Sequence, residues 1–196
     1  MDISDLLKVD ILKIDLGCGP SKKEGYIGID RINLPGVDLV CNFEEGLEFL
    51  PDNCVDEIVS SHLLEHIENI ELLMSEIHRV LKPNGVKKMI VPHFSNPYYY
   101  SDYTHKRFFG LYSMDYFSDG ENNFKRKVPI FYNSKKFKVR KRKLRFASPP
   151  FYFRNKFKAF FTHIFNYNEF MQELYEDLFS NLISCYEIHY ELEPIK

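Results

Sequence analysis

The sequence predicts an α/β fold with a mostly parallel sheet, and three observations support this. Short apolar runs recur along the chain, a strongly amphipathic segment separates two of them, and the first run ends in a glycine turn, ILKIDLGCGP at 11–20. Short buried strands joined by helices or loops are typical of parallel sheets. A chain of 196 residues with 44% hydrophobic and 28% charged residues suits one folded domain.

The first half of the chain is expected to hold five strands and one helix. Each strand is a short apolar run bounded by polar or turn residues, at 8–16, 26–30, 37–43, 55–61 and 87–94. Apolar residues spaced three and four apart predict a helix over 70–81, which Pro83-Asn84-Gly85 should end.

The second half is expected to add two strands, at 136–146 and 183–195. In the first of these the apolar positions change parity between Val139 and Leu144, which predicts a bulge or an exposed edge strand. Phe and Leu residues at helical spacing predict two helices between the strands, divided near Asn166-Tyr167-Asn168.

Charge is distributed unevenly. Residues 122–168 hold 14 of the 26 Lys and Arg residues and none of the 28 acids. Such a segment suggests a surface for an anionic partner. The four cysteines have no CxxC spacing and are expected to be reduced thiols in a cytoplasmic protein. No apolar run of membrane-spanning length and no secretory leader is recognised, which also favours a cytoplasmic location.

The carboxyl ends of parallel strands meet at one edge of a sheet, where ligands bind. Polar and small residues stand at these predicted ends and should converge on one crevice: Asp15, Gly17, Cys18, Gly19, Asp30, Asn42, Phe43, Ser61, His62 and His93.

The glycine turn does not fit a phosphate-bearing ligand. A dinucleotide fingerprint needs GxGxxG, but Lys22 occupies the third glycine position and Pro20 lacks an N–H. No GK[ST] follows either, so a P-loop is excluded. Asp30 could bind both hydroxyls of a ribose, while Asn42 and Phe43 offer an amide and an aromatic face to adenine. The pattern favours an adenosine without phosphates over a simple tight turn.

Five segments, in order over residues 10–95, resemble the motifs of class I S-adenosylmethionine-dependent methyltransferases of the type 11-like group. These segments are DLGCGP, YIGID, VDLVCNF, LPDNCVDEIVSSHLLEHI and EIHRVLKPNG. The resemblance implies a Rossmann-like fold with a seven-stranded, mostly parallel sheet and helices on both faces. It implies one domain over 1–196, with a cofactor-binding half at 10–95 and an acceptor-side half at 96–196. The two helices expected near the end form an insertion at about 150–183, before the last strand.

The resemblance implies S-adenosylmethionine as cofactor and S-adenosylhomocysteine as product. Asp15, Gly17, Cys18 and Gly19 would surround the methionine part, Asp30 the ribose, Asn42 and Phe43 the adenine, and Ser61 and His62 the sulfonium. Two features depart from the family. Residues 20–25 are too few for the usual first helix, so residues 3–10 are expected to cover the methionine part. Asn42 also stands where many relatives have Asp.

Three residues after the fifth strand are the predicted catalytic groups. His93 or His105 would accept a proton from a hydroxyl or amine acceptor, with Asp102 orienting one of them. Two metal-binding alternatives exist, a trio of these three residues and the H-x-x-E-H pattern at 62–66, but no metal is expected. A structural role in an ordered loop is the remaining alternative.

The acceptor is expected to be a small or lipid-linked anionic molecule. Tyr98, Tyr99, Tyr100, Tyr103, Phe108 and Phe109 would form its wall or lid, or else a small core. Basic residues alternate with Phe in FYFRNKFKAFF at 151–161, which leaves peripheral membrane contact open. Nucleic acid is less favoured because no named binding motif is present. The alternatives are an RNA methyltransferase, a zinc hydrolase, and an inactive cofactor-binding partner subunit.

Overall fold

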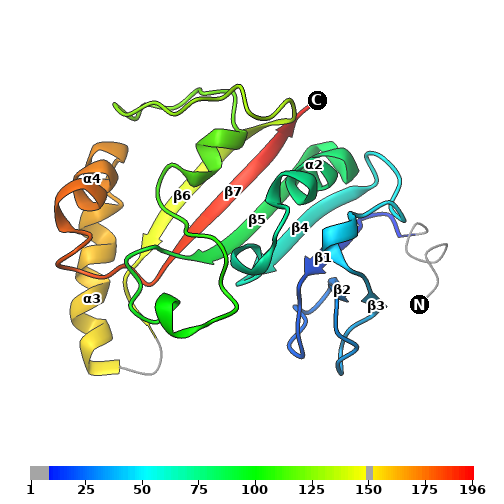
Figure 1. Ribbon diagram of the computed structural model, residues 1–196, viewed down its shortest axis with the longest axis horizontal. Helices are drawn as coiled ribbons and strands as arrows, with labels where there is room; N and C mark the ends of the chain where they lie inside the picture. The colour runs from blue at the N-terminus through cyan, green and yellow to red at the C-terminus, as the bar shows by residue number, and fades with distance from the viewer. Residues whose placement is uncertain (1–8, 149–151) are drawn as a thin grey trace.

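A computed structural model describes residues 9–148 and 152–196. Its sheet has seven strands in the order β3-β2-β1-β4-β5-β7-β6 (Figure 1). Only β7 runs antiparallel to its neighbours. The predicted α/β fold with a mostly parallel sheet is therefore confirmed. The strands are β1 Lys13–Leu16, β2 Ile27–Asp30, β3 Leu39–Val40, β4 Val55–Ser61, β5 Leu81–Pro92, β6 Lys136–Arg145 and β7 Glu187–Ile195.

The helix between β4 and β5 is α2, Ile70–Val80. Asn69 caps its first turn by accepting a hydrogen bond from the Leu72 N–H, and the apolar face predicted from spacing is buried. The helix ends at Val80, before Pro83-Asn84-Gly85, so the prediction that these three residues end it was wrong. Those three residues lie inside β5, which starts at Leu81, and the pairing of β4 with β5 shifts register there.

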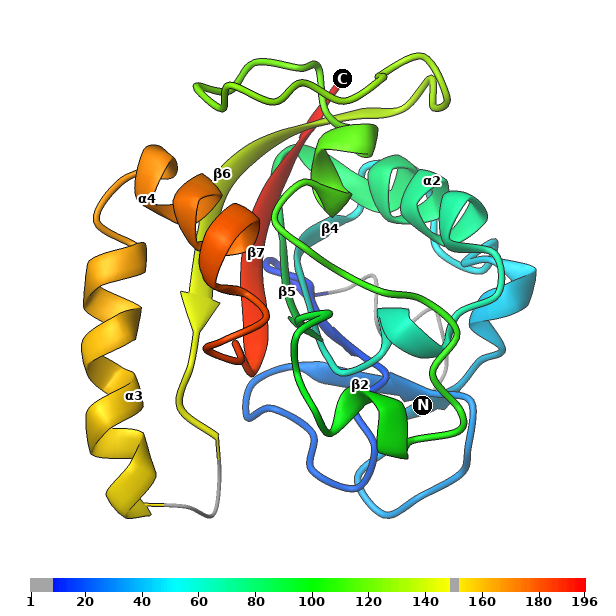
Figure 2. The ribbon, with the colours of Figure 1, turned by 60° about the vertical axis from the view of Figure 1, so that its left-hand side comes forward.

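The insertion before β7 consists of α3, Tyr152–Phe165, α4, Glu169–Leu174, and a π-helical turn, Tyr175–Phe179. Asn168 begins α4 by capping the Met171 N–H, which confirms the predicted division between two helices. Figures 1 and 2 show α3 and α4 side by side next to β6, while α2 lies over β4 and β5. No described helix is long and apolar enough to span a membrane.

The two faces of the sheet are unlike each other. One face carries fully buried apolar side chains, including Ile58, Val91 and Ile188, beneath the helices and loops. The opposite face carries partly exposed residues such as Val59 and His189, and a concavity of about 560 Å³ lies over it. This concavity is lined only by strand and loop residues. In the described part of the chain, helices therefore cover one face.

The expected helices on the second face are missing because the connections there are short. The sheet passes from β1 to β2 through residues 17–26 and from β2 to β3 through 31–38, and both segments are turns. In β6 the register shifts between Val139 and Lys141, so the predicted bulge is confirmed. The bulge brings Leu144 onto the same buried face as Val139.

Lys87 lies on the buried face, where its side chain is fully enclosed. Its Nζ donates to Ser60 Oγ at 2.6 Å. Burial lowers the pKa of Lys87 to about 7, although the nearby charge of Asp15 opposes this.

We predict that Lys87 makes stability depend on alkaline pH. The unfolded chain keeps an ordinary lysine pKa of about 10.4, so it binds more protons than the folded chain between about pH 7 and pH 10. The contribution of Lys87 to the free energy of unfolding should therefore rise with pH across that window. Lys87→Met should abolish this rise and raise stability at pH 7 by about 2 kcal/mol. Urea unfolding at pH 7 and 9.5 measures both effects. Lys138→Met, at an exposed site, is the control, and equal behaviour of the two variants would contradict the prediction.

Candidate functional site

The glycine turn and the loop after β4 are in direct contact. Gly17 and Gly19 have φ values of +71° and +55°, a region that favours glycine. A Cβ on Gly17 would lie 2.8 Å from Leu63 Cδ1, so a larger residue would force the two loops apart. Gly17 N also donates to Ile29 O at 2.8 Å. The ends of β1, β2 and β4 thus meet as the sequence predicted.

Asp30 is held at the end of β2 by two backbone groups. Its Oδ2 accepts from Gly19 N at 2.9 Å and its Oδ1 from Ile32 N at 3.0 Å. A carboxylate has about four acceptor positions, so it can still accept from two hydroxyls. A Cβ built on Gly19 meets nothing within 4 Å, so space is open in front of the turn. These residues fit the adenosine and methionine parts of S-adenosylmethionine.

Lys22, the residue that breaks the dinucleotide fingerprint, is fixed by Asp38. Lys22 Nζ lies 2.6 Å from Asp38 Oδ2, which also accepts from Gly28 N at 2.7 Å. Asp15 is 8% exposed and accepts from Lys23 N at 2.8 Å, which closes the same turn. Cys18 is half-buried, and burial followed by the charges of Asp15 and Asp30 raises the pKa of its thiol. All four cysteines are unpaired.

The two residues expected to contact adenine lie differently. Asn42 is exposed and caps the short 3-10 turn Phe43–Glu45 by accepting from Glu44 N at 3.3 Å. Its Nδ2 donates to Glu45 Oε1. Phe43 is 2% exposed and belongs to the core, so its ring does not face solvent in this conformation. The adenine assignment stays a prediction.

His62 follows β4 in a left-handed conformation, with φ of +53°. Its Nε2 lies 3.4 Å from Glu187 Oε2 and its Nδ1 lies 3.2 Å from Glu65 Oε1. Glu187 first and Glu65 second raise the pKa of His62 to about 9. His62 is therefore a cation at neutral pH and cannot accept a proton there. Ser61 beside it is exposed and lines the concavity on the open face.

Sequence reasoning missed Glu187, which belongs to no recognised motif, and it considered Glu65 only as part of the H-x-x-E-H pattern. Glu187 is 4% exposed and also accepts from His189 Nε2 at 2.7 Å and from Arg145 Nη1 at 2.9 Å. Burial works against ionisation, but the hydrogen bonds from His189 and His62 lower the pKa of Glu187 to about 2. The available signal was an acid at the start of a strand expected to be buried.

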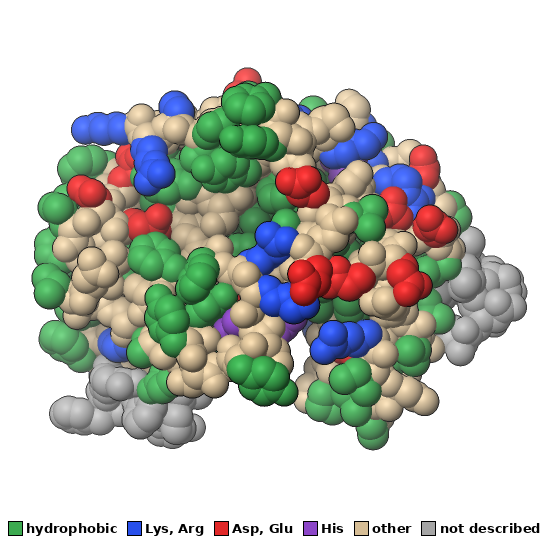
Figure 3. Space-filling view, in the orientation of Figure 1, with side chains coloured by type: hydrophobic (Ala, Val, Ile, Leu, Met, Phe, Trp, Pro, Cys, Tyr) green, Lys and Arg blue, Asp and Glu red, His purple; other side chains and the backbone are tan. Residues whose placement is uncertain are grey.

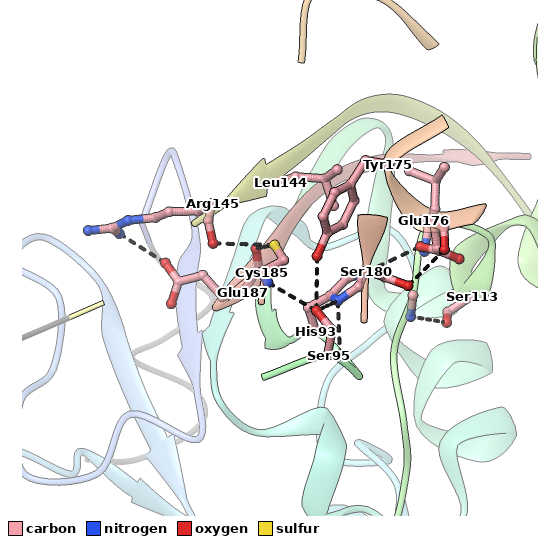
Figure 4. Close-up of polar contacts among 12 residues, drawn as sticks. His93, Ser95, Ser113, Leu144, Arg145, Tyr175, Glu176, Ser180, Cys185 and Glu187 are labelled. Atoms are coloured by element: carbon pink, nitrogen blue, oxygen red, sulfur yellow. Dashed lines mark hydrogen bonds and ion pairs between the residues drawn. The ribbon is translucent and has the colours of Figure 1, made fainter. Parts of the chain in front are cut away.

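His93 is enclosed, with no exposed surface. Its Nδ1 accepts from Ser95 N at 3.1 Å, and its Nε2 lies 3.3 Å from Glu176 Oε2. Ser95 Oγ lies 3.0 Å from the hydroxyl of Tyr175, so this group joins β5 to the π-helical turn (Figure 4). Both ring nitrogens of His93 are engaged inside the protein.

His105 and Asp102 are brought together as predicted, with Nε2 and Oδ2 3.5 Å apart. His105 Nδ1 lies 3.0 Å from Tyr99 O, and the ring lies 4.9 Å from the ring of His66. In the described chain, His93 does not share a potential metal-binding cluster with these two residues, and His62 does not share one with His66.

The aromatic residues expected to form an acceptor wall divide into two groups. Tyr99 and Phe109 are buried, whereas the others are exposed by between 42% and 97%, namely Tyr98, Tyr100, Tyr103 and Phe108. Figure 3 shows a notch between the loop after β5 and the loops after β1 and β2, with histidine side chains at its upper end. The wall and core interpretations therefore each describe part of the set.

Residues 17–87 match the family model of a methyltransferase domain. Among solved structures, a SAM-dependent methyltransferase from Archaeoglobus fulgidus is similar, with 19% identity, a TM-score of 0.54, and coverage of 97% of this chain and 89% of that one. A SAM-dependent methyltransferase from Thermotoga maritima, titled a possible histamine N-methyltransferase, gives 15% identity, a TM-score of 0.55, and coverage of 99% and 86%. No curated protein matches the sequence. The family match and the sheet order confirm the resemblance to the class I S-adenosylmethionine-dependent methyltransferases.

We predict that His62 titrates near pH 9, because its partners stabilise the imidazolium. Replacing Glu187 by Gln removes the larger of the two causes, so the midpoint should fall toward the ordinary value of about 6.5. NMR titration of the His62 ring protons measures the midpoint of its titration, and a chelator in the buffer keeps trace metals from binding the ring. Glu193→Gln on the same strand should leave it unchanged, and a wild-type midpoint near 6.5 would contradict the assigned ion pairs.

Proposed function

We propose that this chain, which has the class I methyltransferase fold, transfers a methyl group from S-adenosylmethionine to a small or lipid-linked anionic acceptor. The observation that carries the cofactor assignment is the hydrogen bond from Gly19 N in the glycine turn to Asp30, with open space in front of Gly19. The cofactor would supply an activated methyl group on its sulfonium.

The chain's own residues would hold that cofactor from three loops. Asp30 would accept from the ribose hydroxyls while still fixing Gly19 N. Gly17 and Gly19 permit close approach of the methionine part, because no side chain stands on either. Leu63 contacts Gly17 and packs the third loop against the turn.

The open face of the sheet supports an anionic acceptor. Its concavity extends from Asp15 on β1 to Lys141 and Lys143 on β6, and Lys23 and Lys88 also line it. Lys88 is paired with Glu57 at 2.9 Å. Within residues 9–148 and 152–196, Lys141 and Lys143 form no ion pair. These two cations are free to bind an anionic group.

An anionic acceptor also agrees with the protonation of His62 and with the engaged ring nitrogens of His93. A carboxylate or phosphate oxygen is already ionised, so positioning against the methyl group supplies much of the acceleration without proton removal. His93 and His105 would then be needed as proton acceptors only for a hydroxyl or amine acceptor, with Asp102 orienting His105. Their catalytic assignment stays a prediction.

Cofactor binding tests the central part of the proposal. Calorimetric titration should give micromolar-range dissociation constants for S-adenosylmethionine and S-adenosylhomocysteine, corresponding to about −8 kcal/mol. Asp30→Ala should weaken binding by about 10- to 100-fold, because charge-assisted hydrogen bonds of about 1.5–3 kcal/mol are lost. Asp177→Asn, at an exposed site on the π-helical turn, is the control. No heat at several temperatures and no competition by either ligand would overturn the cofactor assignment.

Transfer of a labelled methyl group to fractions of a cell extract tests the acceptor class. Label is expected in polar small molecules or lipids, and the Lys141→Ala/Lys143→Ala variant should raise the KM for that fraction about tenfold with cofactor affinity unchanged. Lys138→Ala, which lies outside the concavity, is the matched control. Label in RNA would favour an RNA methyltransferase, and cofactor binding without label in any fraction would favour an inactive partner subunit.

A further inference from the structure

One cluster of side chains is explained neither by the fold nor by cofactor binding. Glu65, His66 and His105 each offer a potential metal-ligand atom, and these atoms all lie within 4.8 Å of one another. Glu65 and His66 belong to the short 3-10 turn Leu64–His66 after β4, while His105 lies in the loop after β5. Two segments that are far apart in sequence thus bring together three potential ligands, one carboxylate and two imidazoles.

Glu65 has a carboxylate oxygen without a partner. The residue has no exposed surface, and its Oε1 is paired with His62. Its Oε2 is buried and has no hydrogen-bond partner within the described residues. An unsatisfied buried carboxylate oxygen is costly unless a cation or a donor compensates it. This oxygen is the independent indication that something positive belongs beside it.

The Nδ1 atoms of both histidines are engaged, which leaves Nε2 as the nitrogen to bind a metal. His66 Nδ1 lies 3.3 Å from Thr104 O and 3.0 Å from Thr104 Oγ1, and His105 Nδ1 lies 3.0 Å from Tyr99 O. A carbonyl accepts only, so each Nδ1 must carry its proton and donate it. In the neutral tautomer each Nε2 then carries a lone pair, although His105 Nε2 lies 3.5 Å from Asp102 Oδ2 and would have to turn from that carboxylate to the metal. Ligand histidines are commonly fixed by such a second bond.

We propose that Glu65, His66 and His105 bind one divalent transition-metal ion, with zinc as the best match. Two imidazoles and one carboxylate form a common zinc ligand set, with a fourth position open to water. Ligand atoms about 2.0 Å from zinc lie roughly 3.3 Å apart in a tetrahedron. The 4.8 Å limit therefore requires side-chain movements of about 1 Å. The proposal does not depend on the methyltransferase activity.

The ion would fasten the loop after β5 to the turn after β4. These segments are already joined, because Lys106 N donates to Glu65 O at 2.7 Å and Arg107 Nε donates to Ile67 O at 2.8 Å. The exposed Phe108 and the buried Tyr99 lie in the same loop, so the ion would fix the aromatic residues predicted to face the acceptor. Coordination through Nε2 would also exclude His105 from acting as a base.

This cluster differs from both metal sites that the sequence suggested. It takes Glu65 and His66 from the H-x-x-E-H pattern but replaces His62 by His105. It takes His105 from the trio after β5 but excludes His93, whose nitrogens are engaged elsewhere. Sequence spacing alone could not show that residues 65 and 105 meet.

Metal binding by untagged protein tests the proposal. After removal of metals with a chelator, titration of zinc chloride should give about one ion per chain and a submicromolar dissociation constant. His105→Gln and Glu65→Gln should each weaken binding by about 100-fold or more. His163→Gln, an exposed histidine on α3, is the matched control and should bind as wild type does. Thermal unfolding should show stabilisation by zinc in wild type and in the control only.

Cobalt substitution keeps the test decisive if a variant fails to fold. Wild-type protein should show visible bands of a tetrahedral or five-coordinate cobalt site without thiolate charge-transfer absorption, because the four cysteines are not ligands. Strong thiolate absorption, absence of zinc binding by wild type, or equal zinc affinity in His105→Gln and His163→Gln would each overturn the proposal.

Discussion

The Glu187 carboxylate is the interaction on which the geometry of the site depends. It is almost fully buried at the start of β7, yet it remains ionised because His62, His189 and Arg145 surround it. Through His62 it fixes the loop after β4, and His62 in turn holds Glu65. A buried charge that lost these partners would be expensive, so the four side chains must stay together. One acid on a late strand thereby positions His62, which is predicted to lie near the sulfonium, and through His62 also Glu65.

A second constraint is that the described residues, 9–148 and 152–196, cover the sheet with helices on one face only. Parallel sheets are normally buried on both faces. The open face of this sheet instead carries charged and polar side chains that can contact water. Lys88 pairs with Glu57 there, and Glu57 also accepts from the hydroxyl of Tyr26. Charged pairs of this kind let strands face water without exposing a large apolar patch. The short turns after β1 and β2 contain no helix, so a basic concavity stays open over this face.

Much of this fold could be predicted from local patterns, and the failures have physical causes. Apolar spacing placed α2 correctly, and the parity change beyond Val139 identified the bulge in β6. Pro83-Asn84-Gly85 was wrongly predicted to end the helix, because turn residues also form irregularities inside strands. In the site, the glycine turn and Asp30 were found from motifs, since their roles depend on nearby backbone. Glu187 and the meeting of Glu65 with His105 depend on tertiary contacts, and no sequence spacing encodes them.

Among the described residues, the structure shows which basic side chains of the segment at 122–168 are ion-paired and which are not. Three arginines of the basic segment at 122–168 are paired with acids, and two of those acids lie on β7 beside β6. Arg140 pairs with Glu193 and Arg145 with Glu187, while Arg142 is buried against Asp115. Buried and paired guanidinium groups stabilise the fold and are not available to a ligand. Lys141 and Lys143 line the open face on either side of Arg142, which strand alternation places on the opposite, buried face. Lys141 and Lys143 are two residues apart on β6, so this pair suits the compact anionic group that is proposed as the acceptor.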